Sequence, residues 1–412
     1  MPGSDLASFN PMLKDQALLD GVKKQINEKT VLLSWLEKTS DYIDATGRKA
    51  IFPALISWPQ GNGARPELGN LPKPKPSKTA QGEVNLSYQY MRLMFSGPAL
   101  EKAKTNKGAF VDLMTFEMDQ AIPSVRRDIN RQMLTGIGAG NITRVGNTQS
   151  GVTISVDGTV NLYENMAIDI YAKSTASDFS DATLIAHDLT IVSVDDQALQ
   201  ITLSAALPST SASPSIWYIF RSESIGSECM GLPGIVDDGT LIDNFEGISR
   251  ATYPRWKGLV FNNNKTLTAI TEQVIQPAYS GIEKTGIPVK MAISSFELRD
   301  GLASTLLSLK RFNDQGAYKL RAGFKGLEFN DLLVFADEQL SYNASLSNPF
   351  YLLCPSTFAV HQTGEMKWDE LGGPILTKVS GVHAYEALMY WFMQLACYRP
   401  NANAVTTYLR KS

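Results

Sequence analysis

Residues 108–135 carry the pattern that most constrains this chain, because apolar side chains recur there at steps of three and four. They are Val111, Met114, Met118, Ile122, Val125, Ile129 and Met133. This spacing predicts one long amphipathic helix with a continuous apolar stripe. Gly136 and Gly138 favour the end of the helix. Pro123 lies inside it, where a proline removes a backbone hydrogen bond and predicts a bend.

The opposite face of this predicted helix is charged. Its basic residues are Arg126, Arg127 and Arg131, and acidic residues lie between and before them. A charged helix face is usually solvated, which is the simplest interpretation. The other interpretation is contact with a neighbouring chain, and the three arginines are our candidates for that contact.

Residues 47–97 predict one long β-hairpin. The first strand is expected from about Lys49 to Trp58 and the second from about Glu83 to Met94, where apolar and polar residues alternate. Between them lies a polar stretch, Gln60 to Gln81, rich in Gly, Pro and Lys. Loops of this length are usually functional, although a plain surface loop is the alternative. Its Lys73, Lys75 and Lys78 could meet acidic patches on an adjacent chain, or could simply be solvated.

Residues 140–222 change in character, with fewer charges and more Ser, Thr, Asp and Gly. Short strand candidates follow one another there, separated by turn residues such as Asp157-Gly158 and Asp195-Asp196. The candidates are Val152–Val156, Ala167–Tyr171, Thr190–Val194, Gln200–Leu203 and Ile216–Phe220. We expect a small all-β domain inserted into the chain, packed on the outside of the main fold.

The remaining chain mixes helices and strands. A helix is expected from about Asn264 to Lys284, then a strand at Val289–Ile293, then a helix opened by a capping box of Ser294 and Glu297. A basic loop follows, and its Lys310 and Arg311 are further contact candidates. Strand-like runs come after it, at Asp331–Ala336, Phe350–Leu353 and Ala384 to about Tyr398. Without a regular βαβ alternation, the fold class is α+β.

Composition and motifs argue against several classes of function. The formal net charge is -3, whereas free nucleic-acid binders usually carry a strong basic excess. Three separated cysteines favour neither a disulfide scaffold nor a zinc site, and we expect a reducing compartment. No apolar stretch is long enough to span a membrane, and no signal peptide is expected. The sequence also lacks HExxH, GxSxG and phosphate-loop motifs. We therefore expect no cofactor, no metal and no enzymatic activity.

The order of these elements resembles that of the major capsid proteins of tailed double-stranded DNA bacteriophages, which share the Hong Kong 97 (HK97) fold. The resemblance covers nearly the full chain. It is carried by Gly108-Ala109-Phe110 leading to Arg131–Gly136, by Gly231–Ile235, by Gly323–Leu327 with Val334–Asp337, and by Tyr385–Leu395 with Arg399–Ala402. No single stretch is as specific as a zinc motif, so the argument depends on their order.

The resemblance implies a division of the chain into the family's parts. These are an N-terminal arm (1–46), an E-loop hairpin (47–107), a spine helix of the peripheral domain (108–139), the inserted β domain (140–222), an axial domain with return segments (223–380) and closing strands of the peripheral domain (381–412). It implies a homo-oligomer of hexamers and pentamers in an icosahedral head. That head would enclose double-stranded DNA without sequence-specific binding, join a portal protein, and form in the host cytoplasm.

Two departures from the family pattern bear on partners. Many relatives carry a long charged scaffolding segment before the arm, and the arm here is too short and too mixed for one. A separate scaffolding protein or none is therefore implied, and decoration proteins stay open. The β insertion is absent from the simplest family members. The main alternative is a shell subunit of an encapsulin-type nanocompartment, and a more distant one is a β-rich enzyme or carbohydrate-binding protein.

Overall fold

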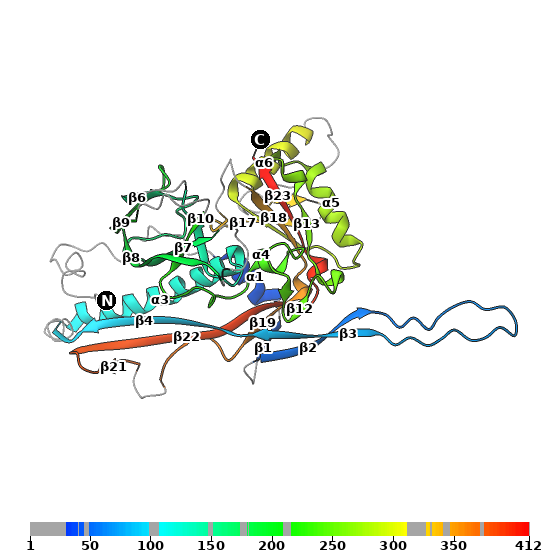
Figure 1. Ribbon diagram of the computed structural model, residues 1–412. Helices are drawn as coiled ribbons and strands as arrows, with labels where there is room; N and C mark the ends of the chain where they lie inside the picture. The colour runs from blue at the N-terminus through cyan, green and yellow to red at the C-terminus, as the bar shows by residue number, and fades with distance from the viewer. Residues whose placement is uncertain are drawn as a thin grey trace.

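The computed structural model describes residues 30–39, 41–44, 49–98, 107–146, 151–173, 179, 181–208, 216–310, 327–329, 332–340, 347–370 and 375–411, and the fold is given for these (Figure 1). Most of the predicted N-terminal arm, the basic loop after Lys310 and its Arg311 lie outside the described residues.

One helix, α3 (Lys107–Thr135), runs along the centre of the molecule, as the apolar stripe predicts. Its second half is buried, because Ile129, Met133 and Leu134 enter the main core. The short helices α1 (Val31–Thr39) and α4 (Leu232–Ile235) contribute to the same core. Pro123 lies inside α3, and the bend there stays a prediction.

A sheet of long strands covers one side of α3 (Figure 1). Its central strand is β22 (Ala384–Cys397), whose alternate residues Trp391, Met393 and Leu395 are buried in the core shared with α3. The antiparallel strand β4 (Ser87–Ser96) pairs with β22 over its whole length. The sheet is completed by β1 (Asp41–Asp44), β19 (Phe358–Gln362), β20 (Lys367–Trp368) and β21 (Thr377–Lys378).

A second, mixed sheet forms a separate layer with its own core. Helices α5 (Glu272–Glu283) and α6 (Phe296–Lys310) pack on it through Ile275, Ile282 and Leu302. Its strands are β13 (Leu259–Phe261), β14 (Thr268–Ala269), β15 (Met291–Ser294), β16 (Leu327–Phe329), β17 (Leu332–Ala336), β18 (Asn348–Leu353) and β23 (Ala404–Arg410). Short 3-10 turns cover Pro254–Trp256, Asn263–Lys265, Pro355–Thr357 and Pro400–Ala402.

Two local predictions in this region were wrong. The helix expected from Asn264 begins only at Glu272, because Asn263, Asn264 and Lys265 have positive φ and cannot continue a right-handed helix. The expected capping box is absent: Leu298 N donates to Ser295 Oγ at 3.4 Å, so Ser295 caps the helix without a reciprocal bond from Glu297, and Ser294 is the last residue of β15. Sequence spacing alone could not distinguish two adjacent serines.

The described residues between 141 and 221 form a third sheet with an independent hydrophobic core. Its order is β5 (Asn141–Arg144), β10 (Ile216–Arg221), β7 (Ala167–Lys173), β8 (Thr183–Asp195), β9 (Gln200–Leu207) and β6 (Gly151–Ser155). A bridge between Val145 and Val156 joins the two ends of this order, so the strands nearly close on themselves. Asp195 accepts bonds from the backbone of Gln197 and Ala198, which confirms the predicted turn.

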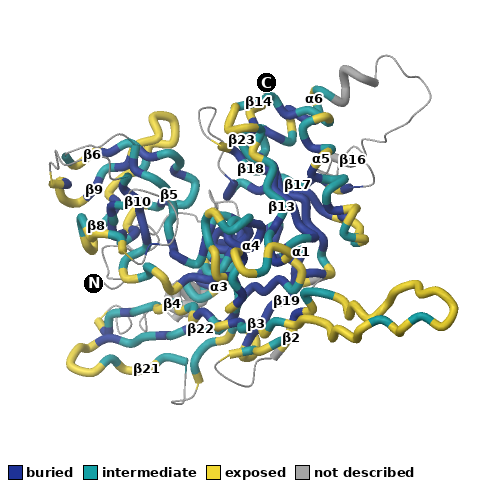
Figure 2. The backbone as a smooth tube through the Cα atoms, turned by 45° about the vertical axis from the view of Figure 1, so that its right-hand side comes forward, coloured by how far each residue is buried: buried dark blue, intermediate teal, exposed yellow. Residues whose placement is uncertain are grey.

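The predicted hairpin is present as β2 (Lys49–Ser57) and β3 (Lys78–Asn85), an antiparallel pair. The second strand begins several residues earlier than expected and continues almost directly into β4. The hairpin projects well beyond the body of the molecule, and Figure 2 shows that its tip is exposed. A minor two-stranded ribbon, β11 (Asn244–Phe245) and β12 (Ile248–Ser249), lies near its base.

Candidate functional site

The tip of the hairpin is the most exposed segment of the described chain. Leu68 and Leu71 are 102% and 86% exposed. This exposure is unfavourable, because the free energy falls when apolar side chains leave water. Lys73 and Lys75 are exposed as well. Lys78 differs, because its ammonium lies 4.8 Å from the ring centre of Tyr253 in the same chain. Contact with an adjacent chain stays a prediction for all three lysines, and Lys73 and Lys75 are the ones at the exposed tip.

The base of the hairpin is fixed to the body. The ring of Phe52 on β2 packs edge-on against Tyr398 with centres 4.8 Å apart, and against Trp256 at 6.1 Å. Gly82 on β3 lies opposite Phe52, and a Cβ at that position would overlap the phenyl ring. The hairpin is therefore an exposed tip on an anchored base.

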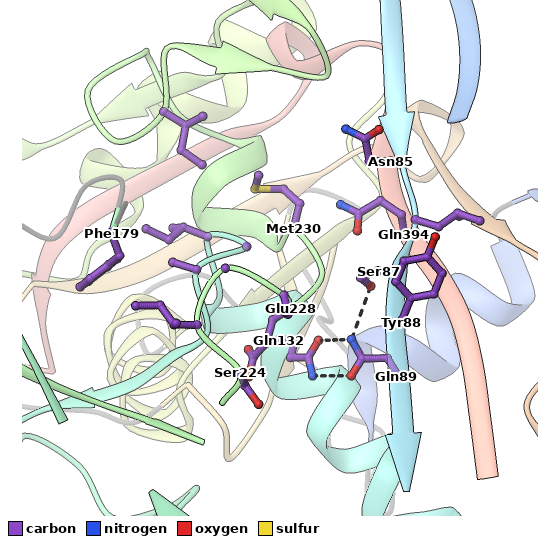
Figure 3. Close-up of a pocket in the computed structure, with 18 of the residues that line it drawn as sticks. Asn85, Ser87, Tyr88, Gln89, Gln132, Phe179, Ser224, Glu228, Met230 and Gln394 are labelled. Atoms are coloured by element: carbon purple, nitrogen blue, oxygen red, sulfur yellow. Dashed lines mark hydrogen bonds between the residues drawn. The ribbon is translucent and has the colours of Figure 1, made fainter. Parts of the chain in front are cut away.

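A large groove of about 1760 Å³ lies between the hairpin base, α3 and the third sheet (Figure 3). It is lined by β3 and β4, by the polar side of α3, and by residues 221–230 and 241–247. The acidic and basic side chains among the described lining residues are Glu83, Asp128, Glu223, Glu228, Asp243, Glu246 and Arg221. Glu83 pairs with Lys49, Asp128 pairs with Arg131 and Arg221, and Glu228 pairs with Arg131. Glu223 and Asp243 are exposed and form no ion pair among the described residues, so they are the carboxylates that the groove presents to solvent.

A reciprocal pair of amides fixes one wall of the groove. Gln89 Nε2 on β4 donates to Gln132 Oε1 on α3 at 2.9 Å, and Gln132 Nε2 donates back to Gln89 Oε1 at 3.0 Å. Gln132 Oε1 also accepts the backbone N–H of Cys229 at 3.1 Å. These bonds hold together β4, α3 and the segment that follows β10, residues 222–231, which we call the return segment.

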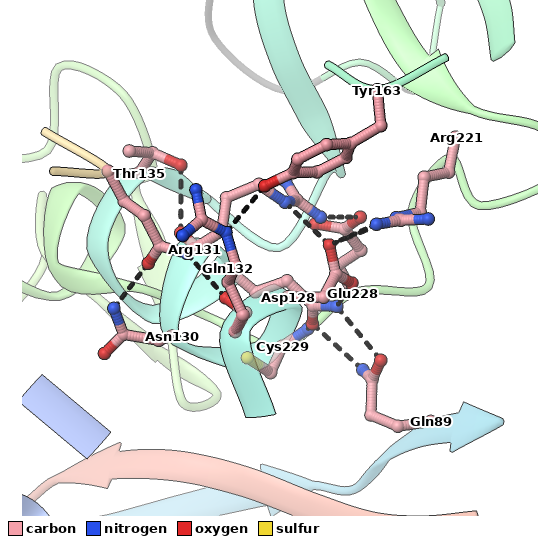
Figure 4. A network of polar contacts seen from close by, with 12 residues as sticks. Gln89, Asp128, Asn130, Arg131, Gln132, Thr135, Tyr163, Arg221, Glu228 and Cys229 are labelled. Atoms are coloured by element: carbon pink, nitrogen blue, oxygen red, sulfur yellow. Dashed lines mark hydrogen bonds and ion pairs between the residues drawn. The ribbon is translucent and has the colours of Figure 1, made fainter. Parts of the chain in front are cut away.

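Beneath the groove, Arg131 lies in a buried ionic network (Figure 4). It is 1% exposed and pairs with Asp128 at 3.0 Å and with Glu228 at 2.5 Å. Arg221, at the end of β10, pairs with Asp128 at 2.9 Å. Burial raises the pKa of Asp128, but the guanidinium groups of Arg131 and Arg221 outweigh it and hold that pKa well below its usual range. The network therefore connects α3 to the third sheet and to the return segment.

The structure places the three predicted arginines in contacts within the chain. Arg126 pairs with Glu37 on α1 at 2.6 Å and is partly exposed. Arg127 is buried, and its Nε donates to Tyr163 Oη at 2.6 Å. Arg131 is almost fully buried, so in this conformation its side chain is not available to another subunit. Lys310 is the last residue of α6, with its side chain outside the described part.

Sequence reasoning missed the partners that bury these charges. Glu228 lies 97 residues from Arg131, and Arg221 lies 93 residues from Asp128. Arg250 was also missed: it is 0% exposed and pairs with Asp237 at 3.2 Å. The only sequence signal was an excess of charge on the predicted helix face, which does not specify a distant partner.

Within the described residues, no group of three or more His, Cys, Asp or Glu side chains could hold a metal ion. The three cysteines are free and buried, and burial raises the pKa of the Cys354 thiol to about 12. In the part of the chain that the structure covers, no helix combines the length and apolarity needed to cross a bilayer.

Comparison with known proteins places this architecture among capsid proteins. No protein-family model and no curated protein matches the chain. The Cyanophage A-1(L) capsid asymmetric unit matches 97% of this chain and 98% of its own, with 12% identity and a TM-score of 0.59. The capsid of a native GTA particle matches 99% of both chains, with 8% identity and a TM-score of 0.53. The chain has a capsid-protein fold. The predicted likeness to phage capsid proteins is thus confirmed at the level of the fold, over nearly the whole length.

Proposed function

We propose that this protein is the major capsid protein of a tailed bacteriophage, a structural subunit without catalytic activity. The observation that carries the proposal is the capsid fold over 97% of the chain, with an anchored hairpin that projects an exposed tip. A subunit in a closed symmetric array needs many modest contacts made at a distance from its own core. A projecting hairpin provides such a contact.

The finer parts of the proposal follow the HK97-like arrangement. Subunits form hexamers and pentamers of an icosahedral head that encloses double-stranded DNA, with a portal protein and a separate scaffolding protein or none. The protein is made in the host cytoplasm and ends in the virion capsid. Residues 140–222 act as an inserted β domain, which the independent core of the third sheet supports. This domain adds contacts between neighbouring subunits or stiffens its own subunit.

The experiment is electron microscopy of purified protein, with and without proteins encoded beside its gene. Closed shells of uniform diameter are expected. A variant in which Asn-Gly replaces residues 58–77 joins the paired residues Ser57 and Lys78 through a two-residue turn. It should fold, because the removed segment is exposed apart from a few partly buried positions, and yet fail to form stable shells.

Two outcomes would contradict the proposal. Wild-type protein that stays monomeric under all assembly conditions would contradict a shell function. Normal shells from the shortened hairpin would contradict the role of the tip. Particles from host cells that hold protein cargo in place of nuclease-resistant DNA would favour the encapsulin-type alternative.

A further inference from the structure

The hairpin tip and the groove beside α3 carry opposite charges. The tip, residues 59–77, contains Arg65, Lys73 and Lys75 against the single acid Glu67. In the groove Glu223 and Asp243 are exposed carboxylates, and neither forms an ion pair among the described residues. The acids Glu83, Asp128 and Glu228 are already paired with Lys49, Arg221 and Arg131. Complementary charges of this kind guide association and fix the register of an interface.

Two groove carboxylates have no cationic partner among the described residues. Glu223 and Asp243 are exposed, and neither forms an ion pair there. Asp243 accepts only neutral donors, the hydroxyl of Ser249 and the backbone N–H of Ala251. Glu228 lies deeper and already pairs with Arg131, so Glu223 and Asp243 are the positions open to a cation from outside.

The tip has the chemistry to supply that cation. In Pro72-Lys73-Pro74-Lys75-Pro76 the prolines fix φ and lack an N–H, so the segment is stiff and poorly suited to adding a strand to a sheet edge. Such a proline-rich segment favours the polyproline II conformation, which has three residues per turn, so Lys73 and Lys75 project at different angles from a stiff backbone. Both side chains are exposed, and their ammonium groups can meet two separate carboxylates.

The tip does not reach the groove of its own chain. The groove begins at Glu83 on β3, and the strand leads from there away from the groove toward the tip (Figure 1). The eight residues from Glu83 to Lys75 span on the order of 25 Å when extended. The base that would have to bend is anchored by Phe52 against Tyr398. A tip that docks in this groove therefore belongs to a second copy.

We propose that the tip of one subunit docks in the acidic groove of its neighbour, where Lys73 and Lys75 pair with Glu223 and Asp243. This inference rests on the proposed shell function and identifies the surface that receives the hairpin. In this proposal the groove is the receiving surface of the contact between subunits. The hairpin base, α3 and the third sheet form it jointly.

Charge exchange tests the pairing directly. The double variant Lys73→Glu/Lys75→Glu should raise the critical protein concentration for shell assembly about tenfold or more, since each subunit loses one contact. Glu223→Lys/Asp243→Lys should do the same. The variant that combines all four changes should return to within about threefold of wild type, because the opposite charges are restored in exchanged positions. Lys378→Glu, an exposed reversal on β21, is the matched control and should have no effect.

Cross-linking identifies the partner independently. Shells assembled from equal amounts of ¹⁴N- and ¹⁵N-labelled subunits are treated with a carbodiimide, which joins lysines to carboxylates in contact. Mixed-isotope peptides that link Lys73 or Lys75 to Glu223 or Asp243 are expected. If a charge reversal lowers the urea unfolding midpoint, the neutral pair Lys73→Gln/Lys75→Gln takes its place.

The outcomes separate the inference from the shell function. Wild-type shells combined with unimpaired assembly of the Lys73/Lys75 variants would overturn the docking. So would failure of the fourfold variant to recover, or groove cross-links that come instead from Lys14, Lys23, Lys24 or Lys29 of the N-terminal segment. In each case the shell function stands. Only the absence of wild-type shells would remove the shell function.

Discussion

Replacing Arg131 by methionine should be far more damaging than its position on a charged helix face suggests. The guanidinium is 1% exposed and is the only cation that contacts Glu228 among the described residues. Methionine fills a similar volume, so the change removes charge and hydrogen bonds more than packing. Asp128 keeps Arg221 at 2.9 Å, and the uncompensated charge therefore falls on Glu228.

The expected magnitude follows from this arrangement. Removing one partner of a buried ion pair typically costs about 3–5 kcal/mol, because the other charge stays buried and unpaired. Arg126→Met, on the same helix, should cost no more than about 1 kcal/mol, because its pair with Glu37 is partly exposed. Adding Glu228→Gln to Arg131→Met should recover about half of the loss or more, since no charge is then left without a partner.

Urea unfolding of the unassembled subunit at pH 7, followed by tryptophan fluorescence, measures these differences from the midpoint and slope of the transition. Equal losses for Arg131→Met and Arg126→Met would refute the argument from burial. A double variant as unstable as the sum of its two single variants would refute the argument that Glu228 carries the unpaired charge.

Three further predictions concern other parts of the molecule. Burial raises the pKa of Glu246 from its ordinary 4.5 to about 8, so the folded state retains a proton that the unfolded chain releases, and stability falls as pH rises from about 5 to 8. Glu246→Gln should flatten that slope in urea unfolding between pH 5 and 9, and an unchanged slope would count against the assignment. Gly82→Ala should cost about 1–3 kcal/mol in thermal unfolding by overlapping Phe52, whereas Gly63→Ala at the open tip should be neutral. Met133→Ala should cost about 2–5 kcal/mol, and a loss below 1 kcal/mol would contradict its place in the core.

Elements with a regular hydrophobic period were predictable from the sequence. The helix expected over 108–135 matches α3, because its stripe extends over many turns and local errors average out. The alternating run before Met94 matches β4 for the same reason. Boundaries set by a single backbone conformation were missed. The left-handed residues at Asn263 and Asn264 displaced the start of α5, and the three consecutive asparagines 262–264 were the sequence signal for it, because asparagine adopts positive φ more readily than most residues.

The candidate site was predictable only in part. The tip lysines lie where the polar stretch placed them, since exposure follows from local composition. The environment of the three arginine side chains was not predictable, because a charged side chain is buried only where the fold supplies a partner. For Arg131 that partner is Glu228, brought in by the return of the chain after the third sheet. The sequence shows two charges, and only the tertiary structure shows that they meet.

The anchored base and the exposed tip imply that folding and assembly are separable properties of this chain. α3 holds β4 through Gln132, the third sheet through Asp128 and the return segment through Arg131. Changes in that network should alter the free energy of unfolding first, and shell formation only as a consequence. Changes at Lys73 or Lys75 touch no described contact of their own chain that involves these side chains, so they should leave unfolding unchanged and act on assembly alone. A subunit organised in this way can fold completely as a monomer, and the charge pairing proposed for Lys73 and Lys75 forms only when a neighbour is present.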